Sequence, residues 1–188
     1  MTTTDDEIIA RTRHWLEAAV IGLNLCPFAK PVYAKEQIRY AVSQAETPEA
    51  LLHELIDELQ GLVAADPAVL ETTLLIHPAV LTDFLDYNDF LGVADAAVDD
   101  LGLRGILQIA SFHPHYQFAG TAPDAIENYT NRSPYPLLHL LREASVERAV
   151  QSIPDAAEIY ERNIAALRQL GLKGWRRLGI EPIELDDE

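Results

Sequence analysis

Two apolar segments of this chain end in the same dipeptide, and they constrain the fold more than any other feature. Residues 72–78 read TTLLIHP, and residues 105–114 read GILQIASFHP. Each run is too short for a buried helix, and each ends at a proline, which cannot donate to a sheet ladder. Because a helical pattern lies between them, we expect parallel strands at 73–77 and 106–112 whose carboxyl ends meet at one edge of a sheet.

The pattern of caps and apolar periods predicts helices around these strands. Thr4 and Glu7 have the spacing of a capping box, and Thr47 is followed by a proline at the first helical position. We predict helices from these caps to about residues 24 and 62, and a third helix between residues 80 and 101, either continuous or broken near residue 87.

The remaining strands are less strongly indicated. Alternation over residues 38–42 predicts a half-exposed strand, and a fourth strand is expected within 31–35 or near the C-terminus. The order of elements favours an α/β or α+β fold, in which helices pack a small mixed sheet of three to five strands. A ferredoxin-like layout is the alternative.

The C-terminal third has a different character. Four prolines and many polar residues predict a polar, proline-rich loop at 113–136. We then expect a short helix at 136–143, a long helix from 154 to 170 and a flexible acidic tail near 180–188. A chain of 188 residues with 48% hydrophobic residues predicts a single domain, 1–188.

The charge balance limits the classes of partner. With 14 basic and 30 acidic residues, the chain has a formal net charge of −16, which disfavours nucleic acid and anionic membrane surfaces. No apolar run reaches the ~20 residues of a membrane helix, and the N-terminus lacks the pattern of a signal peptide. One cysteine fits a reducing compartment, so we expect a cytoplasmic protein, with its oligomeric state open.

The expected carboxyl edge carries the first candidate site. His113 is a candidate general acid or base there, and His77 ends the other strand. His115 lies two residues after His113, on the same side of an extended segment. The three imidazoles are therefore candidate ligands of a divalent metal such as zinc, iron, nickel or copper. The alternative is that each histidine bonds a loop carbonyl.

The polar loop carries a candidate ligand site. Arg132 is a candidate anion clamp because a guanidinium binds carboxylate or phosphate bidentately. Candidate partners of the clamp are Tyr116, Asn128, Asn131 and Ser133. The alternative is a loop that satisfies its own polar groups through local turns.

The expected helix at 136–143 would place His139, Arg142 and Glu143 on one face. His139 and Glu143 would form a proton-relay pair or a solvent-exposed pair, and Arg142 would add a ligand-binding cation.

Cys26 is a candidate nucleophile if a histidine or a helix end lowers its thiol pKa, and otherwise a small buried hydrophobe. The chain has no glycine-rich phosphate loop and no dinucleotide-binding pattern, so its cofactor is unknown and only a divalent metal stays open.

Several long segments resemble a bacterial family catalogued as domain of unknown function 1415. They are LNLCPFA, ETTLLIHP, DFLDYNDFL, LQIASFHPHYQFAGT and NYTNRSPYPLLHLLREASVERAV, and the resemblance runs from about residue 8 to residue 170. The resemblance implies no activity. It implies that most candidate residues above lie in signature stretches, whereas His115 is not part of the pattern.

We therefore expect a small-molecule enzyme, a hydrolase or group transferase that acts on an anionic metabolite at the carboxyl edge of the sheet. The alternative is a non-catalytic module that binds an anionic ligand or another protein.

Overall fold

The structure is a computed structural model that describes residues 3–151 and 157–180. The predicted helix start at Pro154 and the predicted acidic tail beyond residue 180 lie outside the described residues. In chain order the elements are α1 (Asp5–Trp15), a π-helical turn η1 (Leu16–Ile21), α2 (Ala29–Ala34), β1 (Ile38–Val42), α3 (Pro48–Ala64), β2 (Thr72–Ile76), α4 (Phe84–Asp100), β3 (Leu107–Phe112), a 3₁₀ helix η2 (Ile126–Thr130), β4 (Leu137–Arg142), α5 (Glu143–Gln151) and α6 (Ala157–Arg177).

The described strands form one mixed sheet with the order β1-β2-β4-β3. β1 and β2 are parallel, and β4 is antiparallel to both of its neighbours. β2 and β3 therefore run in the same direction, so the two His-Pro dipeptides do lie at one edge of the sheet. They are not adjacent, because β4 lies between their strands.

The prediction of a helix at 136–143 is wrong, because residues 137–142 form the central strand β4. The segment pairs with β2 over Thr72–Ile76 and with β3 over Leu107–Phe112. Leu137, Leu138, Leu140 and Leu141 are all buried, so both faces of the strand are apolar, as is typical of a strand covered on both sides.

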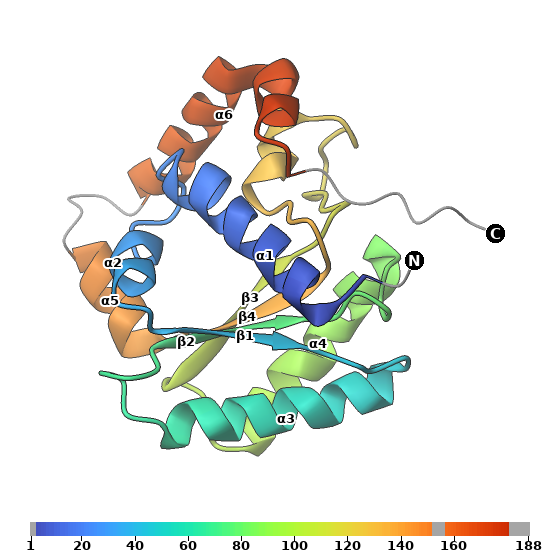
Figure 1. Cartoon of the computed structure of the whole chain (residues 1–188), viewed down its shortest axis with the longest axis vertical. Helices are drawn as coiled ribbons and strands as arrows, with labels where there is room; N and C mark the ends of the chain where they lie inside the picture. Colours follow the sequence, from blue (N-terminus) through green and yellow to red (C-terminus); the bar gives the residue numbers. More distant parts are fainter. Residues whose placement is uncertain (1–2, 152–156, 181–188) are drawn as a thin grey trace.

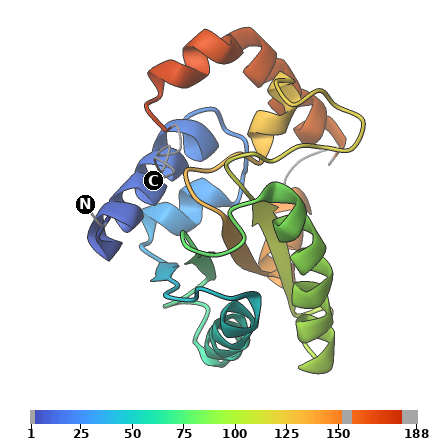
Figure 2. The ribbon, with the colours of Figure 1, turned by 90° about the vertical axis from the view of Figure 1, so that its right-hand side faces the viewer.

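Helices cover both faces of the sheet. In Figure 1, α3 lies below the sheet, α4 slopes down toward it at the right, and α1 and α2 lie above the sheet. One buried cluster joins α3 and α4 to the lower face through residues such as Leu55, Tyr87 and Leu138. A second cluster joins α1 and η1 to the upper face and reaches α6, which packs on η2 at the far end of the molecule (Figure 2). The expected mixed α/β class is confirmed.

The caps place the first helices as predicted. Thr4 and Glu7 form both bonds of the capping box, and Thr47 accepts a hydrogen bond from Ala50 ahead of α3. The third helix is continuous through Tyr87, but it begins at Phe84 after the Asp83 cap rather than near residue 80. Residues 31–35 were a candidate strand, but 29–34 form α2 instead.

The ferredoxin-like alternative is wrong for the described residues, because that layout joins its second and third strands directly, whereas α4 separates β2 from β3 here. No helix among the described residues has the length and apolar character needed to cross a membrane.

Candidate functional site

The histidines at the carboxyl edge are buried and already bonded. His113 accepts a hydrogen bond from the His115 N–H at Nδ1 (3.0 Å), and its Nε2 lies 3.2 Å from the Leu81 carbonyl oxygen. His77 Nδ1 lies 2.9 Å from the Val80 carbonyl oxygen. Burial lowers the pKa of His77 and of His113 to about 4, so both rings are neutral near pH 7. Both histidines thus hold loops in place at the ends of β2 and β3.

The three candidate metal ligands do not converge on one point. The rings of His113 and His115 are 6.0 Å apart at their centroids, and His113 and His77 both contact the ring of Tyr87. Within residues 3–151 and 157–180, no three His, Cys, Asp or Glu side chains form a group able to hold a metal ion.

Asn128 organises the polar loop from its centre. The side chain is fully buried, and its Oδ1 accepts from the Phe118 N–H (3.0 Å) and the Thr121 hydroxyl (2.8 Å). Its amide group donates to the Ala122 and Pro123 carbonyls at 2.8 and 3.4 Å. All of its hydrogen-bonding capacity is therefore engaged inside the loop.

The other loop candidates make similar internal contacts. Arg132 donates to the Tyr116 and Pro123 carbonyls, and its guanidinium lies 4.2 Å from the centre of the Tyr129 ring. Asn131 donates to the Ser111 carbonyl, and Ser133 donates to the Tyr135 carbonyl. Tyr116 packs its ring against Phe84 and Phe118. These bonds fit the alternative of a loop that satisfies itself.

The strand conformation of β4 separates the residues expected on one helical face. Arg142 reaches the end of α3, where it donates to the carbonyls of Leu62, Ala65 and Leu70. Glu143 begins α5 and accepts from the Gly105 N–H. His139 bonds Thr72 on the neighbouring strand, so it does not pair with Glu143.

His139 and Cys26 do share one cavity. It has a volume of about 40 Å³ and lies between the upper face of the sheet and the layer formed by α1, η1 and α2. Burial raises the pKa of the Cys26 thiol, although the main-chain N–H groups of Phe28 and Ala29 oppose the shift. Burial also lowers the pKa of His139 to about 4. Thiol and imidazole are thus both uncharged near pH 7.

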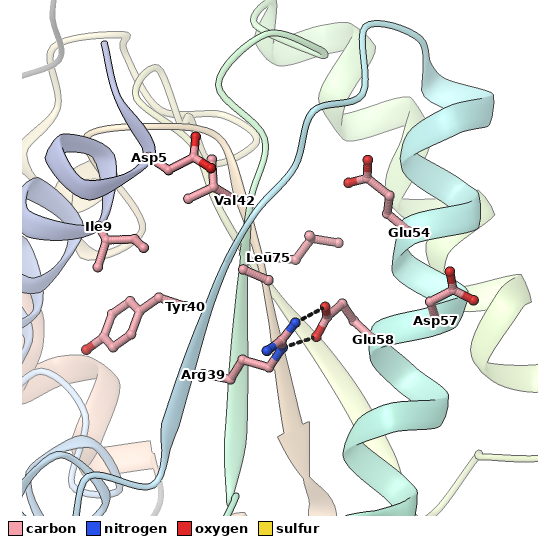
Figure 3. Close-up of a pocket in the computed structure, with 10 residues that line it drawn as sticks. Asp5, Ile9, Arg39, Tyr40, Val42, Glu54, Asp57, Glu58 and Leu75 are labelled. Atoms are coloured by element: carbon pink, nitrogen blue, oxygen red, sulfur yellow. Dashed lines mark hydrogen bonds and ion pairs between the residues drawn. The ribbon is translucent and has the colours of Figure 1, made fainter.

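A much larger groove runs along β1. Its volume is about 340 Å³, within the range of ligand sites. Figure 3 shows β1 as its floor, α1 on one side and α3 on the other. Its charged lining residues are Asp5, Arg39, Glu54, Asp57 and Glu58.

The floor of this groove is an open sheet edge. The Gln37 carbonyl accepts from Glu71 and Thr72, and the Ser43 N–H donates to the Ile76 carbonyl, so the odd-numbered residues of this stretch direct their main-chain groups to β2. Main-chain groups alternate along a strand, so those of Ile38, Tyr40 and Val42 point away from β2. Among the described residues, no strand pairs with this edge.

Comparison with known proteins gives one result. The model of a family described as "Protein of unknown function (DUF1415)" matches residues 7–177. The chain belongs to this family. No curated protein and no solved structure matches it.

In this member of the DUF1415 family, Cys26 and His139 were candidate site residues from the sequence, whereas the groove along β1 was not predicted. Two signals for the groove were present: the alternation of residues 38–42, and three carboxylates at helical spacing at 54, 57 and 58. Neither signal shows that β1 is an edge strand, because that depends on where β4 inserts.

Proposed function

We propose that this protein is a binding module that captures an extended, basic segment of a partner protein as an additional strand along β1. The observation that carries the proposal is the outward main-chain edge of Ile38, Tyr40 and Val42 at the floor of a 340 Å³ groove. An extended peptide binds such an edge through main-chain hydrogen bonds and gains specificity from its alternate side chains.

The two sides of the groove predict the sequence pattern of the segment. On the α3 side, Glu54 and Asp57 form no ion pair with any described residue, whereas Glu58 is paired with Arg39 by two bonds of 2.8 and 2.9 Å (Figure 3). On the α1 side, Ile9 and the Tyr40 ring offer apolar surface. Successive side chains of a strand point to opposite faces, so basic and apolar residues should alternate.

The charge of the groove favours a partner over a second copy of this chain. Four carboxylates and one guanidinium line it, and the whole chain carries a formal charge of −16. Two copies paired edge to edge would bring acidic walls together, and like charges facing each other are destabilising. A lysine-rich segment would meet complementary charge.

The polar loop supports this choice over an enzyme that acts on an anionic metabolite. The Asn128 amide is fully engaged within the loop, and the described bonds of Arg132 go to loop carbonyls, so the loop offers few free donors to an anion.

A synthetic peptide with the alternating sequence KVKVK tests the proposal. We expect it to bind the full-length chain in fluorescence anisotropy, and a KKVVK peptide of the same composition to bind several-fold more weakly. N-methylation of the residues whose N–H groups face β1 should abolish binding, whereas N-methylation of the alternate residues should not.

Variants of the protein test the charge contribution. Glu54→Gln with Asp57→Asn should weaken binding of KVKVK about two- to thirtyfold, because exposed ion pairs contribute roughly 0.2–1 kcal/mol each. Asp89→Asn with Asp95→Asn makes the same change of charge on exposed positions of α4 and should leave binding unchanged. Equal binding of KVKVK and KKVVK, or equal loss in both double variants, would refute the proposal.

A further inference from the structure

The small cavity shared by Cys26 and His139 has a defined chemistry that is independent of the β1 groove. Its walls are mostly apolar and include the aromatic side chains Trp15, Phe28 and Phe112. The polar side chains among its lining residues are Cys26, Thr72 and His139, together with the Trp15 indole, whose N–H donates to the Arg132 carbonyl.

The hydrogen bonds of Thr72 fix the tautomer of His139. The Thr72 hydroxyl donates to the Leu140 carbonyl oxygen, which is 2.5 Å away and can only accept. The hydroxyl has one proton, so toward His139 Nε2, at 2.8 Å, its oxygen acts as the acceptor. Nε2 therefore carries the ring proton, and Nδ1 has a free lone pair.

That lone pair has no donor among the described residues. The bond to Thr72 is the hydrogen bond that the structure gives the His139 ring, and the ring otherwise contacts Phe112 at 6.2 Å between centroids. Unlike Nε2 of His77, which is fully enclosed and has no partner, His139 Nδ1 is not fully enclosed by its surroundings. The acceptor is thus accessible on a residue that lines the cavity.

The cavity is small and electrically neutral. A volume of 40 Å³ accommodates about three to four groups the size of a water molecule. Burial keeps the imidazole and the thiol uncharged near pH 7, so neither stabilises a charged ligand.

We propose that the cavity is a binding site for the uncharged, hydrogen-bond-donating end of a small apolar molecule, such as the hydroxyl group of an alkyl alcohol. The ligand hydroxyl donates to His139 Nδ1, and the thiol of Cys26 is a weak donor to the hydroxyl oxygen. The alkyl group contacts the aromatic and aliphatic walls.

A pair of small probes tests this site on the full-length chain. 1-Propanol and propionitrile have the same number of non-hydrogen atoms, but propionitrile has no hydrogen-bond donor. In an NMR titration of isotope-labelled protein, 1-propanol should shift the resonances of Cys26, Thr72 and His139 saturably, and it should slow alkylation of Cys26 by iodoacetamide. Its affinity should exceed that of propionitrile about two- to tenfold, the range expected for one net hydrogen bond.

Thr72→Val removes the acceptor that fixes the tautomer, so the preference for 1-propanol should disappear while weak binding of both probes remains. Nitrogen spectra of His139 in the unsubstituted chain should show Nδ1 unprotonated at neutral pH. A protonated Nδ1, equal affinity for the two probes, or shifts confined to residues outside the cavity would each overturn the proposal. These readouts do not depend on peptide binding at β1.

Discussion

Tyr87 fills a gap in the hydrogen-bond ladder between β3 and β4. Its side chain is fully buried, and its hydroxyl donates to the Leu137 carbonyl at 2.9 Å and accepts from the Phe112 N–H at 3.0 Å. Phe112 and Leu137 face each other in the register of the two strands. The hydroxyl thus takes the place of a direct bond at the end where the strands separate toward the polar loop.

We predict that Tyr87→Phe lowers the free energy of unfolding by about 2–4 kcal/mol. The change removes only the hydroxyl and leaves the buried Leu137 carbonyl and the Phe112 N–H without their partner. Each of these two groups, left buried without a partner, costs about 1–3 kcal/mol. The variant no longer has to remove a hydroxyl group from water on folding, and this gain offsets part of the combined cost.

Urea unfolding followed by circular dichroism measures the change, and amide hydrogen exchange at Phe112 should accelerate in the variant. Tyr135→Phe is the matched control, because the Tyr135 hydroxyl is buried without a hydrogen-bond partner in the described structure. Its removal should be neutral or stabilising. A loss below about 0.5 kcal/mol for Tyr87→Phe, or losses of equal size in both variants, would refute the reasoning.

Three further outcomes are expected. The pKa values of His77, His113 and His139 are lowered to about 4, so below their ordinary pKa near ~6.5 the unfolded chain binds more protons than the folded chain. The free energy of unfolding should therefore be highest above pH ~6.5 and fall toward pH ~4 by up to about 1.4 kcal/mol per pH unit for each histidine. Equal unfolding free energies at neutral pH and about pH 5 would contradict this. Arg142→Met should cost about 2–4 kcal/mol in urea unfolding, because three carbonyls near the end of α3 lose a charged donor, and an unchanged midpoint would argue against that role. Asn128→Ala should make residues 113–136 the first site of limited proteolysis, and cleavage as slow as in the unsubstituted chain would show that the loop does not depend on this side chain.

Local signals predicted the elements whose ends are set by nearby residues. The Thr4 and Thr47 caps placed α1 and α3, and the His-Pro dipeptides placed the ends of β2 and β3 at one edge. These features depend on main-chain donors within a few residues, so a single sequence contains them.

Tertiary context decided what the sequence did not predict. Residues 137–142 read LLHLLR, which has good intrinsic helix propensity, but burial on both sides between β2 and β3 favours a strand. That one difference separated Arg142 and Glu143 from His139, and it placed β4 between β2 and β3 rather than against β1. The walls of the cavity shared by Cys26 and His139 come from segments far apart in the chain, so no local pattern of the sequence marks its outline.

The position of β4 also determines when the sheet can form during synthesis. β1 and β2 can pair as soon as both have left the ribosome, but β3 has no partner until residues 137–142 follow it. Until then the chain exposes one side of β2 and both sides of β3, and unpaired edges of apolar strands promote aggregation. Because the strand that joins the two halves is made last, a nascent chain that stalls before residue 137 should need a chaperone, whereas one released after β4 can close the sheet by itself.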